Sequence, residues 1–502
     1  MNWSFWLPLL ILLSSLVTGV LIFLLDEDQS LVRTALNLTG SLAKLILTIV
    51  VAFGVLHGAQ YEARLPIIPG FDLLLRVDPI SLLFVSLSAV LWLITTLYAV
   101  GYLEKSPHRS RFFGFFSLCV TATMGIALAG NLLTFFIFYE MLTLATYPLV
   151  VHRGTREALL AGRNYLYYTL GGGAALLLGI VWLQVIAGSV EFTLGGVARL
   201  AETHPNHLRF IFVLMMLGLG VKAAIVPLHA WLPQAMVAPA PVSALLHAVA
   251  VVKAGVYGIV RVIYEIFGIE FAGELGLLAP LAAFASVTII YGSIRALAQQ
   301  DLKRRLAYST VSQLSYIVLG ASILGPLASI GALAHLVHQG LMKITLFFCA
   351  GNFAETLGVS RIDELNGIGR RMPWTMTAFT VGALGMIGVP PLAGFVSKWY
   401  LGLGGLAAGQ SYVVAVLLVS SILNACYFLP IVYRGWFLAP HDGWRPRITG
   451  TVFETHWLLL MPALTTAALS VAVGLFAGWG WSPLALAEII AGQLYVTEGG
   501  AD

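Results

Sequence analysis

The sequence predicts an all-α integral membrane protein of about fourteen transmembrane helices, with two inverted five-helix repeats that each contain a broken helix. Three observations lead to this fold class. The 502-residue chain is 59% hydrophobic and only 10% charged, whereas soluble domains average about 25% charged residues. Apolar stretches long enough to cross a bilayer recur along the whole chain. Prolines interrupt the apolar pattern at two places, one in each half of the chain.

Each expected helix is an apolar stretch of roughly the 20 residues that a bilayer requires. The first segment is too long, and is followed by too many others, to be a cleaved signal peptide. The fourteen segments are 3–25, 33–56, 79–103, 112–130, 131–152, 164–187, 210–226, 241–265, 276–298, 306–324, 327–354, 374–402, 411–433 and 457–480.

Loop charges predict the orientation of these helices. Loops after the third, fifth, ninth, eleventh and thirteenth segments carry three basic residues each, against four in total on the other side (Arg64, Arg76, Arg199 and Arg209). Basic loops stay in the cytoplasm. We therefore predict a multi-pass protein of the cell (inner or plasma) membrane with both termini on the outer side. The basic set is Lys105, Arg109, Arg111, Arg153, Arg156, Arg163, Lys303, Arg304, Arg305, Arg361, Arg370, Arg371, Arg434, Arg445 and Arg447.

Several classes of function are disfavoured by composition. The three cysteines lie inside apolar segments and form no CxxC pair, which argues against iron–sulfur, zinc and disulfide frameworks. The GGG run at 171–173 lies within an expected helix, where helix packing explains it better than phosphate binding. The net charge of +4 is small and its basic residues are spread over loops, so we expect no nucleic-acid partner, no cofactor and no metal.

Lysine is distributed differently from arginine. Five of the seven lysines fall in apolar segments (Lys44, Lys222, Lys253, Lys343 and Lys398), while most of the twenty arginines lie in loops or at helix ends. A buried lysine can lose its proton whereas arginine stays charged, and a charge at mid-membrane costs at least ~3 kcal/mol. Such lysines are therefore candidates for moving protons. The exception is Lys44, which we expect to extend to the membrane interface.

Other ionisable groups inside the apolar segments extend this set. Glu140 is the deepest carboxylate, and a packing ion pair is the alternative to a transport role. His335, His338 and Lys343 follow one another on a single expected helix, which favours a proton relay over a metal site. His229 and His247 are further relay candidates beside the first interruption.

The interruptions themselves predict hydrated cavities. Pro227 and Pro233 break the helix that begins near 210, and Pro390 and Pro391 break the segment that carries Lys398. Backbone groups freed inside hydrocarbon must face protein or water. Paired broken helices in two halves are typical of inverted-repeat transporters. We expect an N-terminal three-helix segment (1–111), a first repeat (112–267), a second repeat (268–437), and a cytoplasmic loop with a final helix (438–502).

Five motifs of the sequence resemble the antiporter-like family shared by proton-pumping subunits of respiratory complex I, Mrp-type Na⁺/H⁺ antiporters and membrane-bound hydrogenases. They are YEMLTLATYPLV (139–150), VKAAIVPLHAWLPQAMVAPAPVSALLHA (221–248), DLKRRLAYSTVSQLSYI (301–317), HLVHQGLMKITLF (335–347) and GVPPLAGFVSKW (388–399). The resemblance implies a fourteen-helix bundle that passes protons and assembles with other membrane subunits. It assigns family transport positions to Glu140, Lys222, Lys253, Lys343 and Lys398. The sequence departs from the family at Gln339, where a histidine is usual, with His338 one place earlier.

The chain is thus expected to be an ion-translocating subunit, not an enzyme by itself, in which Glu140 and Lys222 form a switchable ion pair. Its length and the lysine at 398 resemble the D subunit of Mrp-type Na⁺/H⁺ antiporters. The alternative is a pumping subunit of a complex I-type NADH:quinone oxidoreductase or of a membrane-bound hydrogenase. The expected partners are membrane subunits, lipid and H⁺, with Na⁺ or K⁺ left open. A quinone-binding redox enzyme, a structural spacer, and a lipid-active enzyme with His335 or His229 as base near Ser309 and Ser312 fit less well.

Overall fold

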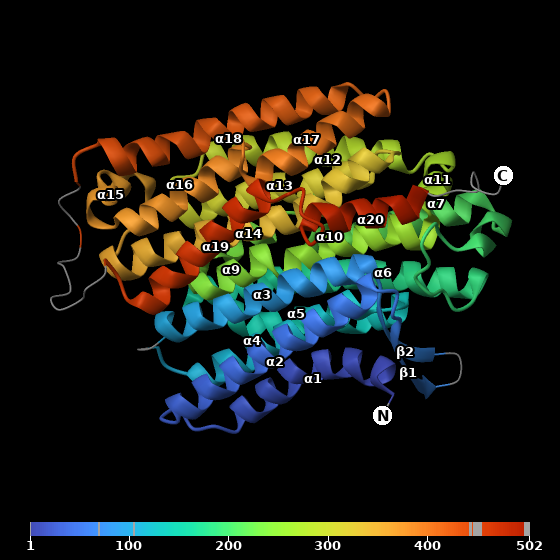
Figure 1. Ribbon diagram of the computed structural model, residues 1–502, viewed down its shortest axis with the longest axis horizontal. Coiled ribbons are helices and arrows are strands. Elements are labelled where there is room, and N and C mark those ends of the chain that lie inside the picture. Colours follow the sequence, from blue (N-terminus) through green and yellow to red (C-terminus); the bar gives the residue numbers. More distant parts are fainter. Residues whose placement is uncertain (1, 69–70, 104–105, 441–443, 445–453, 496–502) are drawn as a thin grey trace.

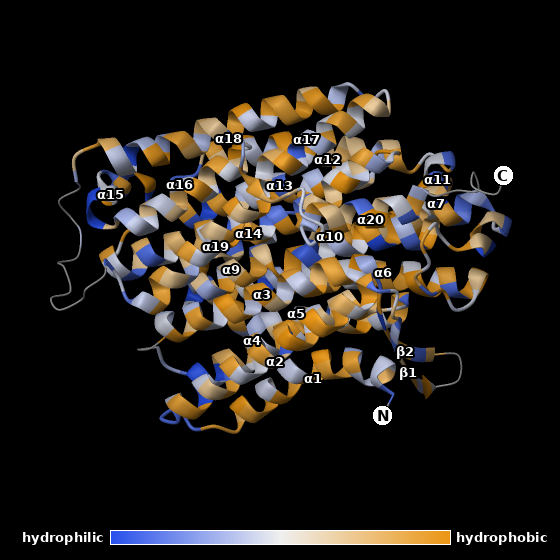
Figure 2. Cartoon of the chain, in the orientation of Figure 1, coloured by the Kyte–Doolittle hydropathy of each residue, from blue (hydrophilic) through white to orange (hydrophobic). Residues whose placement is uncertain are grey.

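The computed structural model describes residues 2–68, 71–103, 106–440, 444 and 454–495. Within these ranges the chain is an elongated bundle of helices that run side by side (Figure 1). Most of the bundle is hydrophobic, and hydrophilic residues gather at its two ends and at places in its middle (Figure 2). Lys105, Arg445 and Arg447, which contribute to the loop charge bias, lie outside the described residues.

The first half of the chain is helical apart from one hairpin. Its elements are α1 (Trp3–Phe23), α2 (Ser30–Leu56), β1 (Tyr61–Ile68), β2 (Phe71–Val77), α3 (Pro79–Tyr102), α4 (Arg109–Leu128), α5 (Leu132–Val150), α6 (Arg156–Ala187), η1 (Ala198–Glu202), α7 (Pro205–Lys222), α8 (Trp231–Gln234), η2 (Ala235–Val237), α9 (Ala240–Ala248), α10 (Val251–Arg261) and η3 (Val262–Phe267). Here η3 is a π-helix.

The described residues of the second half form helices joined by loops. Its elements are α11 (Ile269–Glu274), α12 (Leu278–Leu297), α13 (Leu302–Ala321), α14 (Pro326–Leu357), η4 (Ile362–Leu365), α15 (Ile368–Arg371), α16 (Pro373–Ile387), α17 (Ala393–Ala407), α18 (Tyr412–Phe437), α19 (Trp457–Leu475) and α20 (Pro483–Tyr495).

Helix starts follow local capping chemistry. Asp78 accepts a hydrogen bond from the Ser81 amide at 2.7 Å, directly before Pro79, which opens α3. Asn131 caps α5 in the same way through the Thr134 amide at 2.8 Å. Both side chains satisfy amide groups that a helix N-terminus leaves unpaired. The boundary at 130–131 between two adjoining apolar segments is therefore set by a cap.

The all-α membrane fold is confirmed, but the count of fourteen spans is not. Eleven helical stretches in the described residues are long and apolar enough to cross a membrane, and one of them, Ala240–Phe267, comprises α9, α10 and η3. The other three expected segments are also helical. The first is the shorter helix α7, the second is the more polar α13, and the third is divided into α16 and α17.

Three features of the fold were not predicted: a hairpin, a helix interruption and a short C-terminal helix. Strands β1 and β2 form an antiparallel hairpin in which Tyr61 pairs with Val77. The segment expected at 241–265 is interrupted between α9 and α10. The helix α20 follows the last expected span and packs, like α19, against α3 and the central helix α14, as the red helices in Figure 1 show.

Candidate functional site

The site is built around lysines in the interior of the bundle. Lys222, Lys253 and Lys343 are completely buried, and Lys398 is 8% exposed. Each of the four donates a hydrogen bond to a main-chain carbonyl of a neighbouring segment. Among the described residues, none of the four takes part in an ion pair with a carboxylate. Lys253, Lys343 and Lys398 are thus held by dipoles and not by opposite charges, whereas the Glu140 carboxylate also acts on Lys222 electrostatically.

Lys222 is the last residue of α7. Its ammonium group donates to the carbonyl of Tyr139 in α5 and lies 3.3 Å from the centroid of the Tyr139 ring. The Tyr139 hydroxyl in turn donates to the Gly218 carbonyl of α7 at 3.0 Å. The ammonium group of Lys222 therefore makes a cation–π contact with the Tyr139 ring.

Glu140 follows Tyr139 on α5 and is half-buried. Its Oε1 atom is buried without a hydrogen-bond partner in the described residues, and the carboxylate packs against Gly173 of α6. Lys222 acts on this carboxylate electrostatically, but the two groups form no ion pair in the described part of the chain. The expected pair is thus not closed in this structure, and its switching stays a prediction.

The helix that begins at Pro205 ends at Lys222, and the next long helix begins at Ala240. Pro227 lies in the irregular stretch between them, and Pro233 lies in the short helix α8. The Trp231 indole donates to the carbonyl of Val221 at 2.8 Å. The same carbonyl accepts from the Ala224 amide at 3.1 Å, so the indole adds a second donor at the end of α7.

A second interruption separates α9 from α10. Residues Val249 and Ala250 depart from helical geometry, and Lys253 follows one turn later. Its ammonium group donates to the Leu336 carbonyl of α14 at 2.5 Å. The sequence gives no signal here, since neither proline nor glycine stands at the interruption.

The central helix α14 carries His335, His338 and Lys343, all completely buried. His335 Nδ1 lies 2.8 Å from the Ser397 hydroxyl of α17, which joins the two helices. Neither ring nitrogen of His338 has a hydrogen-bond partner in the described residues. Lys343 donates to the Ser309 hydroxyl at 2.5 Å and to the Leu306 carbonyl at 3.3 Å, both on α13.

Unpartnered polar atoms gather around His335 and His338. In the described residues, both amide atoms of Gln339 and of Gln313, the Tyr316 hydroxyl and His335 Nε2 lack partners while being buried. The Tyr316 ring stacks on His335 at 5.3 Å. Buried polar groups require hydrogen bonds, so this part of the interior suits water molecules. Gln339, the departure from the family pattern, lies within the same region.

Lys398 lies in α17, just after the break that separates α16 from α17. Its ammonium group donates to the Met386 and Ile387 carbonyls at 2.9 Å each, where α16 ends, and to the Ser421 hydroxyl at 3.2 Å. Pro390 and Pro391 lie in the gap before α17. The lysine thus pairs with carbonyls that the interruption leaves free.

The two remaining histidines differ in surroundings. His247 of α9 is completely buried, stacks on Phe347 at 4.5 Å, and is acted on electrostatically by Lys343. His229 lies in the first interruption and contacts the Tyr291 ring at 5.1 Å. The arrangement brings His247 toward the α14 lysine but gives His229 no acidic or basic hydrogen-bond partner in the described residues.

Comparisons with known proteins identify a family and relatives with the same architecture. The family described as NADH:quinone oxidoreductase/Mrp antiporter, TM, matches residues 129–424. The chain belongs to this family. A second family, NADH-Ubiquinone oxidoreductase (complex I), chain 5 N-terminus, matches residues 70–113. These two ranges cover the helices that carry Glu140 and the four site lysines.

Relatives within the family come from two kinds of assembly. The chain is 37% identical over 424 residues to NADH-quinone oxidoreductase subunit N of Desulforudis audaxviator, with 81% of this chain and 83% of that protein covered. It is 27% identical to the D subunit of the Na(+)/H(+) antiporter of Bacillus subtilis, with 94% of each covered. A chain of the Mrp complex from Dietzia shares the fold, with a TM-score of 0.86, 24% identity, and 99% and 98% coverage.

One buried ionic cluster was missed by sequence reasoning. Arg261, completely buried at the end of α10, contacts Asp78 at 2.7 Å and Glu265 of η3 at 2.6 Å. It also donates to the Ala129 carbonyl at 2.8 Å. The available signal was the pair of opposite charges four residues apart, Arg261 and Glu265, at the end of an apolar segment.

The expectation for Lys44 was wrong. Lys44 does not reach the membrane interface, since its side chain is completely buried. It donates to the Ser15 hydroxyl of α1 at 2.6 Å and lies 4.6 Å from the Trp92 ring of α3. The physical reason is that α2 turns this side toward α1, α3 and α4, so the long stem cannot follow the lipid-facing surface.

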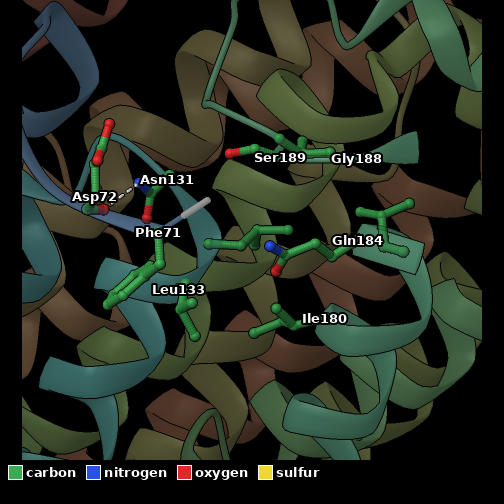
Figure 3. Close-up of a pocket in the computed structure, with 11 residues that line it drawn as sticks. Phe71, Asp72, Asn131, Leu133, Ile180, Gln184, Gly188 and Ser189 are labelled. Carbon is green, nitrogen blue, oxygen red and sulfur yellow. Dashed lines mark hydrogen bonds between the residues drawn. The ribbon is translucent and has the colours of Figure 1, made fainter. Parts of the chain in front are cut away.

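The cavities lie apart from the lysine row. A cavity of about 20 Å³ lies against β2 and the ends of α5 and α6, where Asn131 donates to the Asp72 carbonyl at 2.9 Å (Figure 3). None of the buried lysines or histidines lines it. A second cavity, of about 120 Å³, is lined by Arg153, Lys303 and Ser360 on the side of the basic loops. In the described part of the chain, no three His, Cys, Asp or Glu side chains cluster in a way that could hold a metal ion.

Proposed function

We propose that this antiporter-like membrane subunit translocates protons along its buried lysines and histidines. The observation that carries the proposal is the row of site lysines, each bound to a main-chain carbonyl and none to a carboxylate. A lysine without a counter-charge can release its proton without leaving an opposite charge unpaired. The order that we propose is Lys222, Lys253, Lys343 and Lys398, with Glu140 adjusting the first and His335 and His338 connecting the others.

Within this proposal the chain is not an enzyme by itself, and it works with other membrane subunits. The antiporter assignment, with Na⁺ or K⁺ exchanged for H⁺, is supported by the match to the D subunit of a Na(+)/H(+) antiporter over 94% of both chains. The second candidate is a pumping subunit of a quinone-reducing complex, favoured by the 37% identity to a subunit N. Copurification of the tagged chain identifies the partners, since redox subunits would accompany it only in the second case.

The proposal is tested in membrane vesicles that contain the assembled complex. Lys343→Ala and Lys398→Ala should abolish proton transport while the complex stays abundant, because the relay loses a carrier. Arg304→Ala is the matched control, since Arg304 is an exposed basic residue and surface substitutions usually change stability little. Normal transport in both lysine variants would contradict the proposal, and loss of assembly would instead indicate a structural role.

We also propose the orientation and the repeat boundaries. The charge bias of the loops supports a cytoplasmic Arg304 and both termini outside, in the cell membrane, and the repeats that we propose are 112–267 and 268–437. A cysteine at the exposed position 304 should react with an impermeant thiol reagent only from the cytoplasmic side, and one at the exposed position 202 only from outside. The opposite pattern would reverse the topology.

A further inference from the structure

One face of α2 is polar and buried although the helix looks like an apolar span. Arg33, Asn37, Ser41, Lys44 and Thr48 recur every three or four residues and are at most 3% exposed. The other side of the helix is apolar and outward-facing, with Leu42 and Ile46 about half exposed. Residues at this spacing share one helix face. A polar row therefore crosses the N-terminal three-helix segment, away from the lysine row described above.

Lys44 belongs to this row and stands at the middle of α2. It is 14 residues after the first residue of α2 and 12 before the last, so it lies near the centre of the span. Its ammonium group has one hydrogen-bond acceptor, Ser15, and one aromatic face, Trp92. No acidic or basic side chain in the described residues acts on it electrostatically from α1, α3 or α4.

A chain of hydrogen bonds leads away from Lys44 through α4. The Thr121 hydroxyl lies 2.9 Å from the same Ser15 hydroxyl and 2.9 Å from the Ser117 carbonyl one turn earlier, and its single proton is donated to one of them at a time. The Ser117 hydroxyl lies 3.5 Å from Asn37 Oδ1, which returns the chain to α2. Only the Ser15–Thr121 step joins two hydroxyl groups, which both donate and accept. The Ser117 carbonyl and the Asn37 amide do not carry protons, so a proton that moves along this face needs water.

The chain continues to the surface at the loop between α1 and α2. Asn37 donates to the Arg33 carbonyl at 3.0 Å, and Arg33 donates to the Ser110 hydroxyl at 2.8 Å. The Ser110 amide donates to the Glu27 carboxylate at 3.1 Å, and the Glu27 side chain is 47% exposed. The polar face of α2 thus extends from an exposed carboxylate to the buried lysine.

On the other side of Lys44 the polar atoms lack partners. Thr48 Oγ1, Trp92 Nε1, Ser88 Oγ and Thr96 Oγ1 are buried with no hydrogen bond in the described residues. Ser88, Trp92 and Thr96 are four residues apart and share a face of α3. One turn beyond Thr48, Ala52 lines a cavity of about 160 Å³ that also borders Ser86. This cavity is lined mostly by apolar side chains and by none of these four residues, so their unpartnered atoms lie outside it.

We propose that Lys44 is a second proton-binding site, loaded by water that enters from the Glu27 side along the polar face of α2. The proposal rests on the proton-translocating function proposed above. It adds a proton-entry site that is separate from the row of Lys222, Lys253, Lys343 and Lys398. Lys44 suits reversible protonation because Ser15 accepts from its ammonium form and donates to its neutral form. A permanently charged group here would leave two of its three N–H donors without protein acceptors in the described residues.

Two substitutions separate proton binding from a structural charge. In vesicles that contain the assembled complex, Lys44→Met keeps the length and removes the proton site, while Lys44→Arg keeps a charge that is never released. Both should lower proton transport about tenfold, the effect of a barrier raised by about 1.4 kcal/mol. Leu42→Met, on the lipid side of the same turn, is the control and should transport at the native rate.

A labelling experiment tests the route without reference to activity. A cysteine at position 41 should react with a water-soluble thiol reagent added on the Glu27 side, because thiolates form only where water reaches. A cysteine at position 42, which faces lipid, should not. Cys119 and Cys349 are buried and Cys426 is exposed, so the parent chain gives the background.

The outcomes distinguish this site from the main one. Native transport in Lys44→Met, or rescue by Lys44→Arg, would overturn the proposal, as would equal labelling at 41 and 42. If Lys44→Met does not assemble, Lys44→Arg and the labelling decide. Glu140→Gln is measured in parallel, because native transport in that variant would contradict the main function. The labelling at position 41 does not depend on transport, so it would still test the Lys44 site in that case.

Discussion

The ring of Tyr139 should set the pH range in which Lys222 carries a proton. The Lys222 ammonium lies 3.3 Å from the ring centroid and is completely buried. A desolvated cation–π contact of this kind contributes about 2 kcal/mol. Since about 1.36 kcal/mol corresponds to one pH unit, removal of the ring should move the titration of transport by about 1.5 units.

The direction of the shift follows from the charge. The ring stabilises only the protonated form of Lys222, so Tyr139→Leu should shift the alkaline limb of the transport profile to lower pH by about 1.5 units. Tyr139→Phe keeps the ring face and loses only the hydroxyl bond to Gly218, so its limb should move by less than about 0.5 units. The carbonyl that accepts from Lys222 is main chain and is present in both variants.

The assay is proton uptake into vesicles with the assembled complex, measured across a pH series. Tyr139→Phe controls for packing, because a helix disturbed by Tyr139→Leu would lower the maximal rate without moving the limb. An unmoved limb in Tyr139→Leu, with the complex intact, would refute the role of the ring. Equal shifts in the two variants would assign the effect to the hydroxyl instead.

Three further predictions concern groups outside this contact. Arg261→Gln should destabilise the complex by about 3–5 kcal/mol in thermal unfolding, since buried carboxylates lose their cation, and adding Glu265→Gln should recover part of the loss; an unchanged midpoint would contradict this. Ser309→Ala should change transport about fivefold, because Lys343 loses a bond of about 1 kcal/mol and keeps only the carbonyl; native transport at every pH would contradict it. Burial alone would raise the pKa of Glu191, but its hydrogen bonds to two arginines of the hairpin lower the pKa below the ordinary value. The stabilisation by this group is therefore full above its unfolded pKa of about 4.3 and is lost as pH falls through the lower folded value. Proteolysis of the hairpin should accelerate in that acidic range in the parent but not in Glu191→Gln, and equal acid sensitivity in both would rule the contact out.

Sequence reasoning succeeded where one-dimensional pattern determines the outcome. Spanning helices are long apolar runs, and proline removes the donor that would continue a helix. The ends of α7 and α16, before Pro227 and Pro390, follow from that rule. The rarity of lysine inside such runs selected Lys222, Lys253, Lys343 and Lys398 as candidates, and their transport role stays a prediction.

The failures concern features that only packing determines. Composition could not show that Lys44 faces other helices and not lipid, although the spacing of Arg33, Asn37, Ser41 and Thr48 carried the signal. The interruption at Val249 and Ala250 has no breaker residue, so propensity predicts a continuous helix. The helix α20 has 13 residues, too few to appear as a span.

The buried lysines and Arg261 differ in their hydrogen-bond partners, and this difference relates the fold to the proposed proton translocation. Lys222, Lys253, Lys343 and Lys398 all donate to carbonyls of another helical segment, whereas Arg261 is fixed between two carboxylates. A carbonyl loses little when the lysine becomes neutral, but a carboxylate deprived of its cation would be a buried, uncompensated charge. Broken helices supply such carbonyls inside the bundle, as the end of α16 does for Lys398. The acceptors of Lys222, Lys253 and Lys343 lie within α5, α14 and α13. All four lysines therefore have acceptors that allow them to be charged at one moment and neutral at the next, and for Lys398 an interruption supplies them.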